Sequence, residues 1–224
     1  MSAAAPAPCI PMAEMVAIDA PGIRVCDVPL FDARDPRFEA FGRIVDDFAT
    51  EDVIIATWPA LGWRRVEPGT GNQGGVTEGD FVMTRKGDLM IARNHAVDGH
   101  YVTGWFADPR TASSAGTSPR YDRVLVREAN YHPDGGQVFW PRHGTPFVAL
   151  LALAGDDVRP EDFVAFYCDG SFGIQIFPGI WHQPVFPLAE DAVFDDKQGR
   201  VHACVAVDFV AEFGYYLSVP LRGV

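Results

Sequence analysis

Short apolar runs separated by turn residues follow one another along most of the chain after residue 50. Several of them alternate apolar with polar positions, as in RVLVREANYH (123–132), and the chain's 22 Gly and 18 Pro residues interrupt them. Many short strands at about 8–12-residue spacing, joined by tight turns, are typical of an all-β sandwich or barrel. Strands are predicted over 52–58, 80–86, 88–97, 101–107, 123–132, 137–141, 147–153, 162–168, 173–177, 184–188 and 202–210.

One short helix is predicted before these strands. In DARDPRFEAFGRIV (32–45), Asp35 can cap a helix, Pro36 suits its first position, and apolar residues recur at helical spacing. Gly42 weakens the pattern. A second helix near the C-terminus has no clear sequence signal, so we expect an all-β fold with one or two short helices.

The remaining segments indicate one domain with a tail. Residues 1–25 are rich in Ala and Pro and lack the basic start and apolar stretch of a secretory signal. We interpret them as a flexible tail, or alternatively as an arm that reaches over a partner subunit. We expect 26–224 to form a single domain of two β-rich lobes divided near residue 115, since no long linker separates them. The polar stretch 108–120 is the strongest candidate for disorder or a lid.

Charge and cysteine content narrow the class of protein. The net charge is −12, and an acidic chain repels phosphate backbones, so nucleic acid is not an expected partner. No apolar run approaches the roughly 20 residues of a membrane span, so no membrane partner is expected either. The four cysteines form no C-x-x-C pair. Reduced thiols in a cytoplasmic protein are the simplest interpretation.

Two short motifs carry the candidate chemistry. Asn130, His132, Gln137 and Gly144 follow the spacing N-x-H-x4-Q-x6-G, and a Pro-Gly turn leads to His182 in GIQIFPGIWHQP. Residues two apart on a strand face the same side. Asn130 and His132 would therefore face the barrel interior together, with Gln137 on the returning strand and His182 on the opposite hairpin.

These spacings resemble the two motifs of the cupin superfamily, whose metal-binding members take two histidines and a glutamate from the first motif and a histidine from the second. More closely, the chain resembles the ureidoglycolate lyase family, formerly called ureidoglycolate hydrolase, whose members are cupin-like. The similar segments run in family order from about residue 29 to the C-terminus, and H-P-x-G-x-Q-x-F-x-P and W-H-x-P-x-F are the most specific. The middle, 50–120, matches only loosely. The resemblance implies a cupin-type double-stranded β-helix barrel and a homodimer.

The chain departs from the family pattern at three positions. Asn130 stands where the family tends to have an acidic residue, Phe177 where it tends to have a histidine, and Phe209 where it often has an arginine. A more apolar pocket is expected, which bears more on the exact activity than on the fold.

The two histidines are the central pair of the expected site. His132 and His182 would hold a small hydroxy acid directly or through a metal, although both could instead be satisfied by backbone groups. Gln137 could be a weak metal ligand, a substrate hydrogen-bonding group or an amide that closes a hairpin. The set of Asn, His, Gln and His lacks an anionic ligand, so one divalent metal ion stays an open expectation that Glu128 or water would have to complete.

Other residues are assigned to the site beside a structural alternative. Glu128 shares a strand face with Asn130 and could be a ligand or base, or a partly solvated carboxylate. Asp208 ends an apolar strand, where partial desolvation would raise its pKa and suit proton transfer; a strand-end turn acceptor is the alternative. Arg93 could bind the substrate carboxylate, or lie on the surface. Trp181 and Phe177 are expected as apolar walls of the substrate site.

Three functions follow from these residues. The first is a carbon–nitrogen lyase that splits ureidoglycolate, a small carboxylate, into glyoxylate and urea. The second is a related cupin enzyme, an isomerase, lyase or decarboxylase, acting on another small carboxylate or sugar acid. The third is a non-catalytic metabolite-binding cupin, which is the weakest because the chain has no room for an output domain.

Overall fold

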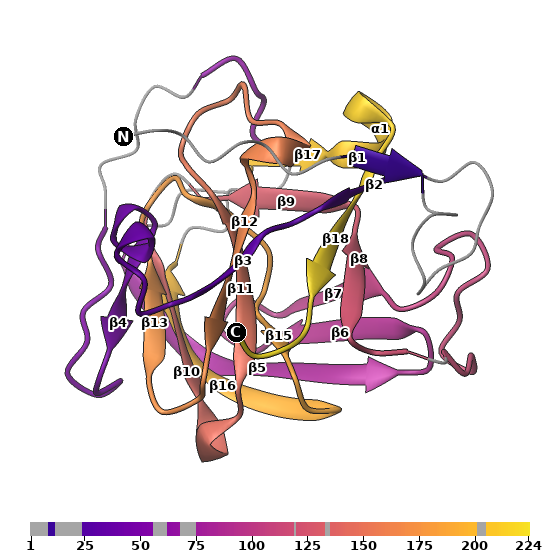
Figure 1. Cartoon of the computed structure of the whole chain (residues 1–224). Helices are drawn as coiled ribbons and strands as arrows, with labels where there is room; N and C mark the ends of the chain where they lie inside the picture. The colour runs from indigo at the N-terminus through magenta and orange to yellow at the C-terminus, as the bar shows by residue number, and fades with distance from the viewer. Residues whose placement is uncertain are drawn as a thin grey trace.

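The computed structural model describes residues 9–11, 24–55, 62–67, 75–118, 120–132, 135–200 and 205–224. In these segments the chain is almost entirely β-structure, arranged in two sheets (Figure 1). None of the described helices has the length and apolar character needed to cross a membrane.

The larger sheet has the strand order β1-β2-β18-β8-β7-β6-β5-β16-β10-β13-β4. Its longest pairing joins β5 to β16 in antiparallel register, from Val76 opposite Gly199 to Thr84 opposite Asp191. The bounds are β1 Cys9–Pro11, β2 Arg24–Asp27, β4 Gly42–Val45, β5 Val76–Lys86, β6 Leu89–Asn94, β7 Gly99–Trp105, β8 Arg123–Val126, β10 Gln137–Pro141, β13 Gly173–Ile176, β16 Asp191–Gly199 and β18 Tyr216–Pro220.

The smaller sheet has the order β17-β9-β14-β11-β12-β3, and β15 pairs with β11. Its centre, β11, is buried at every position because it packs inside the fold on both faces. The bounds are β3 Leu30–Asp32, β9 Glu128–Tyr131, β11 Phe147–Ala152, β12 Val164–Cys168, β14 Trp181–His182, β15 Phe186–Pro187 and β17 Val205–Asp208.

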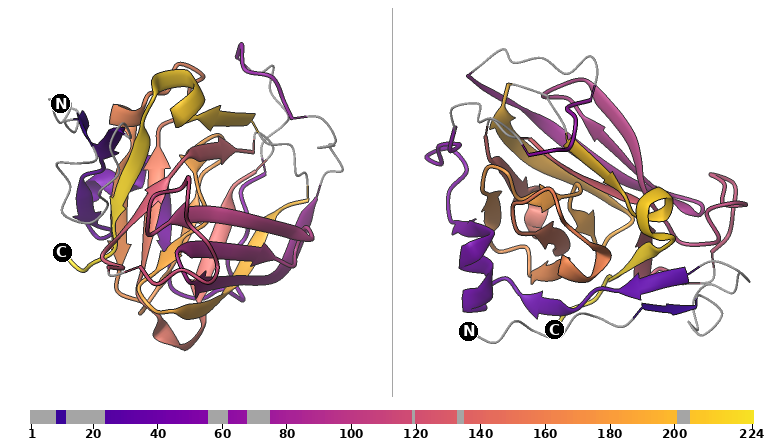
Figure 2. Two further views of the ribbon diagram at one scale, coloured as in Figure 1. Left: turned by 90° about the vertical axis from the view of Figure 1, so that its right-hand side faces the viewer. Right: turned by 90° about the horizontal axis from the view of Figure 1, so that it is seen from above.

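Aromatic side chains join the two sheets across a shared interior. Phe194 of β16 packs edge-on against Phe147 of β11, with ring centroids 5.2 Å apart, and also against Phe139 of β10 at 6.4 Å. Removing each of these rings from water stabilises the fold by about 1.5–3 kcal/mol. The sheets curve around this interior, as the view from above shows (Figure 2, right), and the predicted all-β, cupin-type barrel is confirmed.

The helices differ from the prediction in extent. The first is a 3₁₀ helix over Pro36–Ala40, where Asp35 accepts from the backbone N–H of Arg37 at 2.9 Å. It stops before Gly42 because β4 begins there, and a Cβ at Gly42 would lie 2.1 Å from the Gln175 carbonyl oxygen. At the other end, α1 (Phe209–Phe213) replaces the last residues of the strand predicted over 202–210.

Two predicted segments are wrong in their described parts. Residues 52–55 contribute only an isolated bridge, from Ile55 to Gly135, rather than the beginning of a strand; 56–58 lie outside the described residues. In 108–120 the described residues are held by hydrogen bonds, so the predicted disorder is wrong, whereas the alternative of a lid stays a prediction. Ser118, which is buried, donates from Oγ to the carbonyl oxygen of Phe106 at 2.7 Å.

Most of the predicted tail, residues 1–8 and 12–23, lies outside the described residues. Cys9–Pro11 pair with Arg24–Cys26 in antiparallel register. Strands from both sides of residue 115 share the larger sheet, since β5 pairs with β16 and β7 pairs with β8.

Candidate active site

A small pocket of about 150 Å³ is lined by residues of β9 and β14 together with residues of β6, β10 and β16. Its described lining combines imidazole, amide and carboxylate groups with a few apolar walls. The lining residues are Glu67, Phe81, Asn94, Tyr101, Val102, Glu128, Ala129, Asn130, His132, Gln137, His182, Gln183, Pro184, Gln198 and Ala206.

The two motif histidines meet in this pocket. The rings of His132 and His182 lie edge to face, with centroids 4.7 Å apart and planes at 86°. Strand pairing produces the approach, because His182 of β14 lies opposite Asn130 of β9 and His132 follows directly after that strand. Both histidines are buried.

The protonation of His182 is set by its surroundings. Its Nδ1 lies 2.7 Å from the carbonyl oxygen of Ile180. A carbonyl can only accept, so Nδ1 carries the proton and Nε2 is left as the accepting nitrogen. Desolvation lowers the pKa of His182 to about 4, against a smaller opposing effect of the Ile180 carbonyl. The ring is therefore neutral around pH 7.

A buried network of amides lies at the base of the pocket. Gln137 Nε2 donates to Asp196 Oδ1 at 2.7 Å and to Gln198 Oε1 at 3.0 Å. Asn94 Nδ2 donates to the same Gln198 oxygen at 2.9 Å. Burial raises the pKa of Asp196 to about 7, against the lowering effect of hydrogen bonds from Gln137 and Asn94.

Asn94, Asp196 and Gln198 were not predicted from the sequence. A signal for two of them exists in the alternation of β16, where Asp196 and Gln198 stand two apart on the face that also carries the buried Phe194. Polar residues on the core-facing side of a strand indicate a buried polar site, because burying a polar group without a hydrogen bond destabilises the fold.

The rim of the pocket is acidic. Desolvation raises the pKa of Glu128, and the neighbouring carboxylates of Asp208 and Glu67 raise it further. Asn130 is half-buried beside it and has no side-chain hydrogen-bond partner among the described residues. Gln183, by contrast, donates from Nε2 to the backbone oxygen of Glu128 at 2.5 Å. Glu128 and Asn130 are thus rim groups able to bind a ligand.

Asp208 lies outside the pocket, contrary to the prediction. Its Oδ1 accepts from the backbone N–H groups of Val210 and Ala211 and so caps α1, and its Oδ2 accepts from Arg127 at 2.8 Å. Burial alone would raise the pKa of Asp208, but the hydrogen bonds from Arg127 and from the helix start lower it overall. Asp208 therefore serves as a strand-end acceptor, and the predicted raised pKa is wrong.

Three other predicted site residues do not line the pocket. Arg93 is exposed on β6, because strand alternation turns its neighbour Asn94 inward instead. Trp181 is fully buried on the opposite face of β14 from His182, where its Nε1 donates to the Gly155 carbonyl at 2.8 Å. Phe177 is half-buried against the core. Direct contact of these three with a substrate in the pocket is not supported.

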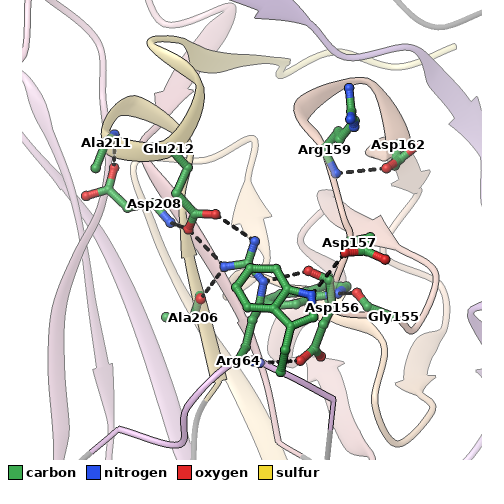
Figure 3. A network of polar contacts seen from close by, with 12 residues as sticks. Arg64, Gly155, Asp156, Asp157, Arg159, Asp162, Ala206, Asp208, Ala211 and Glu212 are labelled. Carbon is green, nitrogen blue, oxygen red and sulfur yellow. Dashed lines mark hydrogen bonds and ion pairs between the residues drawn. The ribbon is translucent and has the colours of Figure 1, made fainter.

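A short segment that leads to the rim was also missed; it comprises residues 62–67, of which Glu67 lines the pocket, and we call it the strap. Figure 3 shows Arg64 held between the loop at Asp156 and helix α1. Its guanidinium donates to Glu212 at 2.7 and 2.9 Å, and its Nε donates to the carbonyl oxygen of Asp156 at 2.7 Å. A bridge between Val66 and Val205 continues the strap, and Glu67 follows in the pocket lining.

The donors in the pocket do not make a closed metal site. No group of three or more His, Cys, Asp or Glu side chains able to hold a metal occurs within the described residues. Two imidazoles remain, together with Gln137, which could offer a metal only its neutral carbonyl oxygen because both of its N–H groups are donated to Asp196 and Gln198. First-row divalent ions prefer more nitrogen or carboxylate donors than this. The metal therefore stays a sequence-based prediction, and no chemical step is assigned to it.

Comparison with known proteins places the chain in a family. The family model for ureidoglycolate lyase matches residues 34–210. A protein named ureidoglycolate lyase from Azotobacter vinelandii is 39% identical over 83 residues, which cover 36% of this chain and 50% of the relative. One of the same name from Salmonella enteritidis PT4 is 29% identical over 112 residues, covering 48% of this chain and 70% of the relative.

A third relative of that name, from Pseudomonas savastanoi pv. phaseolicola, is 35% identical over 75 residues, covering 33% of this chain and 44% of the relative. The matched stretch spans about half the length of most of these curated relatives. The family model, however, extends over most of the chain from the 3₁₀ helix to α1. The chain belongs to the ureidoglycolate lyase family.

Proposed function

We propose that the protein is a carbon–nitrogen lyase that splits ureidoglycolate into glyoxylate and urea. The observation that carries the proposal is the meeting of His132 and His182 in one small polar pocket. The family match supplies the substrate, and the relatives' printed names favour this function over the other two hypotheses.

The proposed reaction requires two proton transfers. The substrate carbon carries a hydroxyl group and a ureido nitrogen. When the hydroxyl proton passes to Nε2 of His182, the oxygen forms the aldehyde C=O bond and the C–N bond breaks. The electron pair of that bond goes to the departing nitrogen, which takes a proton to become urea.

Glu128 is our proposed donor of that second proton. Glu128 is exposed at the rim, and partial burial of its carboxyl together with the carboxylates of Asp208 and Glu67 raises its pKa above the ordinary value. His182 can accept the first proton because its ring is neutral and Nε2 is its accepting nitrogen. The Ile180 carbonyl, which accepts from Nδ1–H, partly offsets the desolvation that disfavours the imidazolium.

The carboxylate of the substrate must be bound without a cation from the described lining, which contains neither Lys nor Arg. We assign this role to the side-chain N–H groups of Asn130 and to the imidazole of His132. Neutral donors hold a carboxylate less strongly than an arginine does. A weakly held carboxylate would suit the release of glyoxylate.

The test is turnover of racemic ureidoglycolate, followed by glyoxylate formation above the spontaneous rate. H182N keeps a donor to the Ile180 carbonyl but removes Nε2, and we expect it to lower kcat by at least 100-fold. H143N is the matched control, because His143 is exposed and has a φ of 63° that Asn tolerates. Wild-type activity no greater than the uncatalysed rate, or equal activity in the two variants, would overturn the proposal.

The homodimer, the cytoplasmic location and the divalent metal ion remain predictions that rest on the family resemblance and on composition.

A further inference from the structure

The hydrogen bonds at the base of the pocket run in one direction, and a backbone group sets that direction. The backbone N–H of Ala96 donates to Asn94 Oδ1 at 2.8 Å. A backbone N–H can only donate, so the oxygen of the Asn94 amide must face Ala96 and its NH₂ must face away.

The orientation of the Asn94 amide determines that of the next two amides, Gln198 and Gln137. Asn94 Nδ2 donates to Gln198 Oε1 at 2.9 Å, which fixes the oxygen of Gln198 toward Asn94. That oxygen also accepts from Gln137 Nε2 at 3.0 Å. The second N–H of Gln137 goes to Asp196 Oδ1 at 2.7 Å. Both N–H groups of Gln137 are therefore used inside the network.

The carbonyl oxygen of Gln137 is left for the pocket. Gln137 lines the pocket, and its Oε1 has no hydrogen-bond partner among the described residues. Among the described residues, three side-chain atoms are both inaccessible to solvent and without a hydrogen-bond partner: Gln175 Oε1, Asp196 Oδ2 and Ser218 Oγ. Gln137 Oε1 is not one of them, so this unpartnered oxygen is accessible from the pocket. The pocket thus presents a hydrogen-bond acceptor at this point, and not a donor.

We propose that Asn94 and Asp196 are positioning residues that hold the Gln137 carbonyl toward the substrate, where it accepts from the ureido N–H beside the bond that breaks. The assignment rests on the proposed function. The hydroxyl proton is the one that His182 receives, and one O–H cannot donate twice, so the remaining substrate donors are the ureido N–H groups. An acceptor at the departing nitrogen orients it for protonation, and it discriminates against analogues that lack the N–H.

Two uncleavable ligands test this without turnover. N-carbamoylglycine keeps the ureido N–H and lacks the hydroxyl, and succinamate replaces that N–H by CH₂. We expect the wild-type protein to bind N-carbamoylglycine at least tenfold more tightly than succinamate in calorimetry. An unpaired Gln137 carbonyl facing a CH₂ group accounts for the difference. Equal affinities would overturn the proposal.

Two variants, each of which replaces an amide by a carboxyl, separate the effect of reversing the amide orientation from the effect of adding a carboxyl to the network. N94D still accepts from Ala96 but offers an acceptor to Gln198, so the amides beyond it must turn over. Q198E keeps the acceptor that both neighbouring amides need. We expect N94D to reduce the ligand preference to less than threefold, while Q198E retains more of it. The proposal would be contradicted if N94D kept the full preference for N-carbamoylglycine over succinamate, or if Q198E lost as much of that preference as N94D.

A measurement on the wild-type protein covers the case in which N94D does not fold. Both side-chain N–H protons of Gln137 should exchange with solvent more slowly than those of Asn130 in NMR spectra, since only the Gln137 amide is bonded on both sides. Equal exchange would overturn the orientation. Absence of ureidoglycolate turnover with the ligand preference intact would instead sink the lyase proposal and leave the orientation of Gln137 standing.

Discussion

Two buried titratable side chains respond to pH in opposite senses: His182 in the pocket lining, and Asp196 in the hydrogen-bond network behind it. His182 has a pKa lowered to about 4 by desolvation, and Asp196 has one raised to about 7 by the same cause. Desolvation favours the neutral form of each side chain. His182 becomes a cation below its pKa, and Asp196 becomes an anion above its pKa. Both side chains are therefore most easily accommodated at mildly acidic to neutral pH.

For His182 we predict an acid-sensitive contribution to stability. The unfolded ring binds a proton below pH 6.5 and the folded ring does not until about pH 4, so stability is complete above pH 6.5 and falls with pH below it. Between pH 7.5 and pH 5.0 the loss is about 2 kcal/mol, at about 1.4 kcal/mol per pKa unit. Urea unfolding of H182N should lack this loss, whereas H143N should retain it. A loss of the same size in H182N would refute the assignment.

For Asp196 we predict the reverse sign. The folded carboxyl keeps its proton up to about pH 7 while the unfolded one releases it near pH 3.8, so this contribution to stability is complete below about pH 3.8 and is lost as the pH rises through 7. D196N cannot ionise, and its stability relative to wild type should rise by about 3–4 kcal/mol between pH 4 and pH 8. The control is D191N, at an exposed position of the same strand, whose relative stability should stay constant. A flat curve for D196N would count against a buried, ionising carboxyl.

At the scale of elements, the sequence predicted strands better than their partners. Alternation and turn residues located most strands, and the spacing of the two motifs placed His132 and His182 in one pocket. Pairings such as β9 with β17 join residues 74 to 80 positions apart, and periodicity within a strand carries no information about its partner. The strand β16, which pairs with β5, was not predicted from the sequence. Asp208 was misplaced because an apolar run gives no signal for the switch from β17 to α1, which depends on its side chain capping the helix.

The strap 62–67 leads to a prediction at this scale. Arg64 is buried while its partner Glu212 is one-third exposed, so we expect R64Q to cost about 2–3 kcal/mol, below the range for fully buried pairs. Release of the strap should raise KM for ureidoglycolate more than it lowers kcat, because Glu67 and the rim move while His182 stays in place. R110Q, which breaks an exposed pair with Asp108, should change stability by less than about 0.5 kcal/mol. Unchanged hydrogen exchange at Val66 in R64Q would contradict this role of Arg64.

At the scale of the whole molecule, the two halves of the chain are parts of one structure. The division near residue 115 does not correspond to a gap between sheets, since β5, β6 and β7 lie in the same sheet as β8, β10 and β16. Phe194 of β16 then joins that sheet to β11 of the smaller one. No half could bury its apolar face alone, because each would leave the partner strands of the other unpaired.

We therefore predict a single cooperative unfolding transition that depends on the contact between the sheets. F194A removes a fully buried ring that touches Phe139 and Phe147, and we expect a loss of about 3–5 kcal/mol. Tryptophan fluorescence and far-ultraviolet circular dichroism should shift to the same lower urea midpoint, since the residues on both sides of position 115 unfold together. L153A, at a side chain that is 54% exposed, should move the midpoint very little. Two separated transitions in F194A would show instead that the halves are independent folding units, and the account of one barrel enclosing the pocket would then fail.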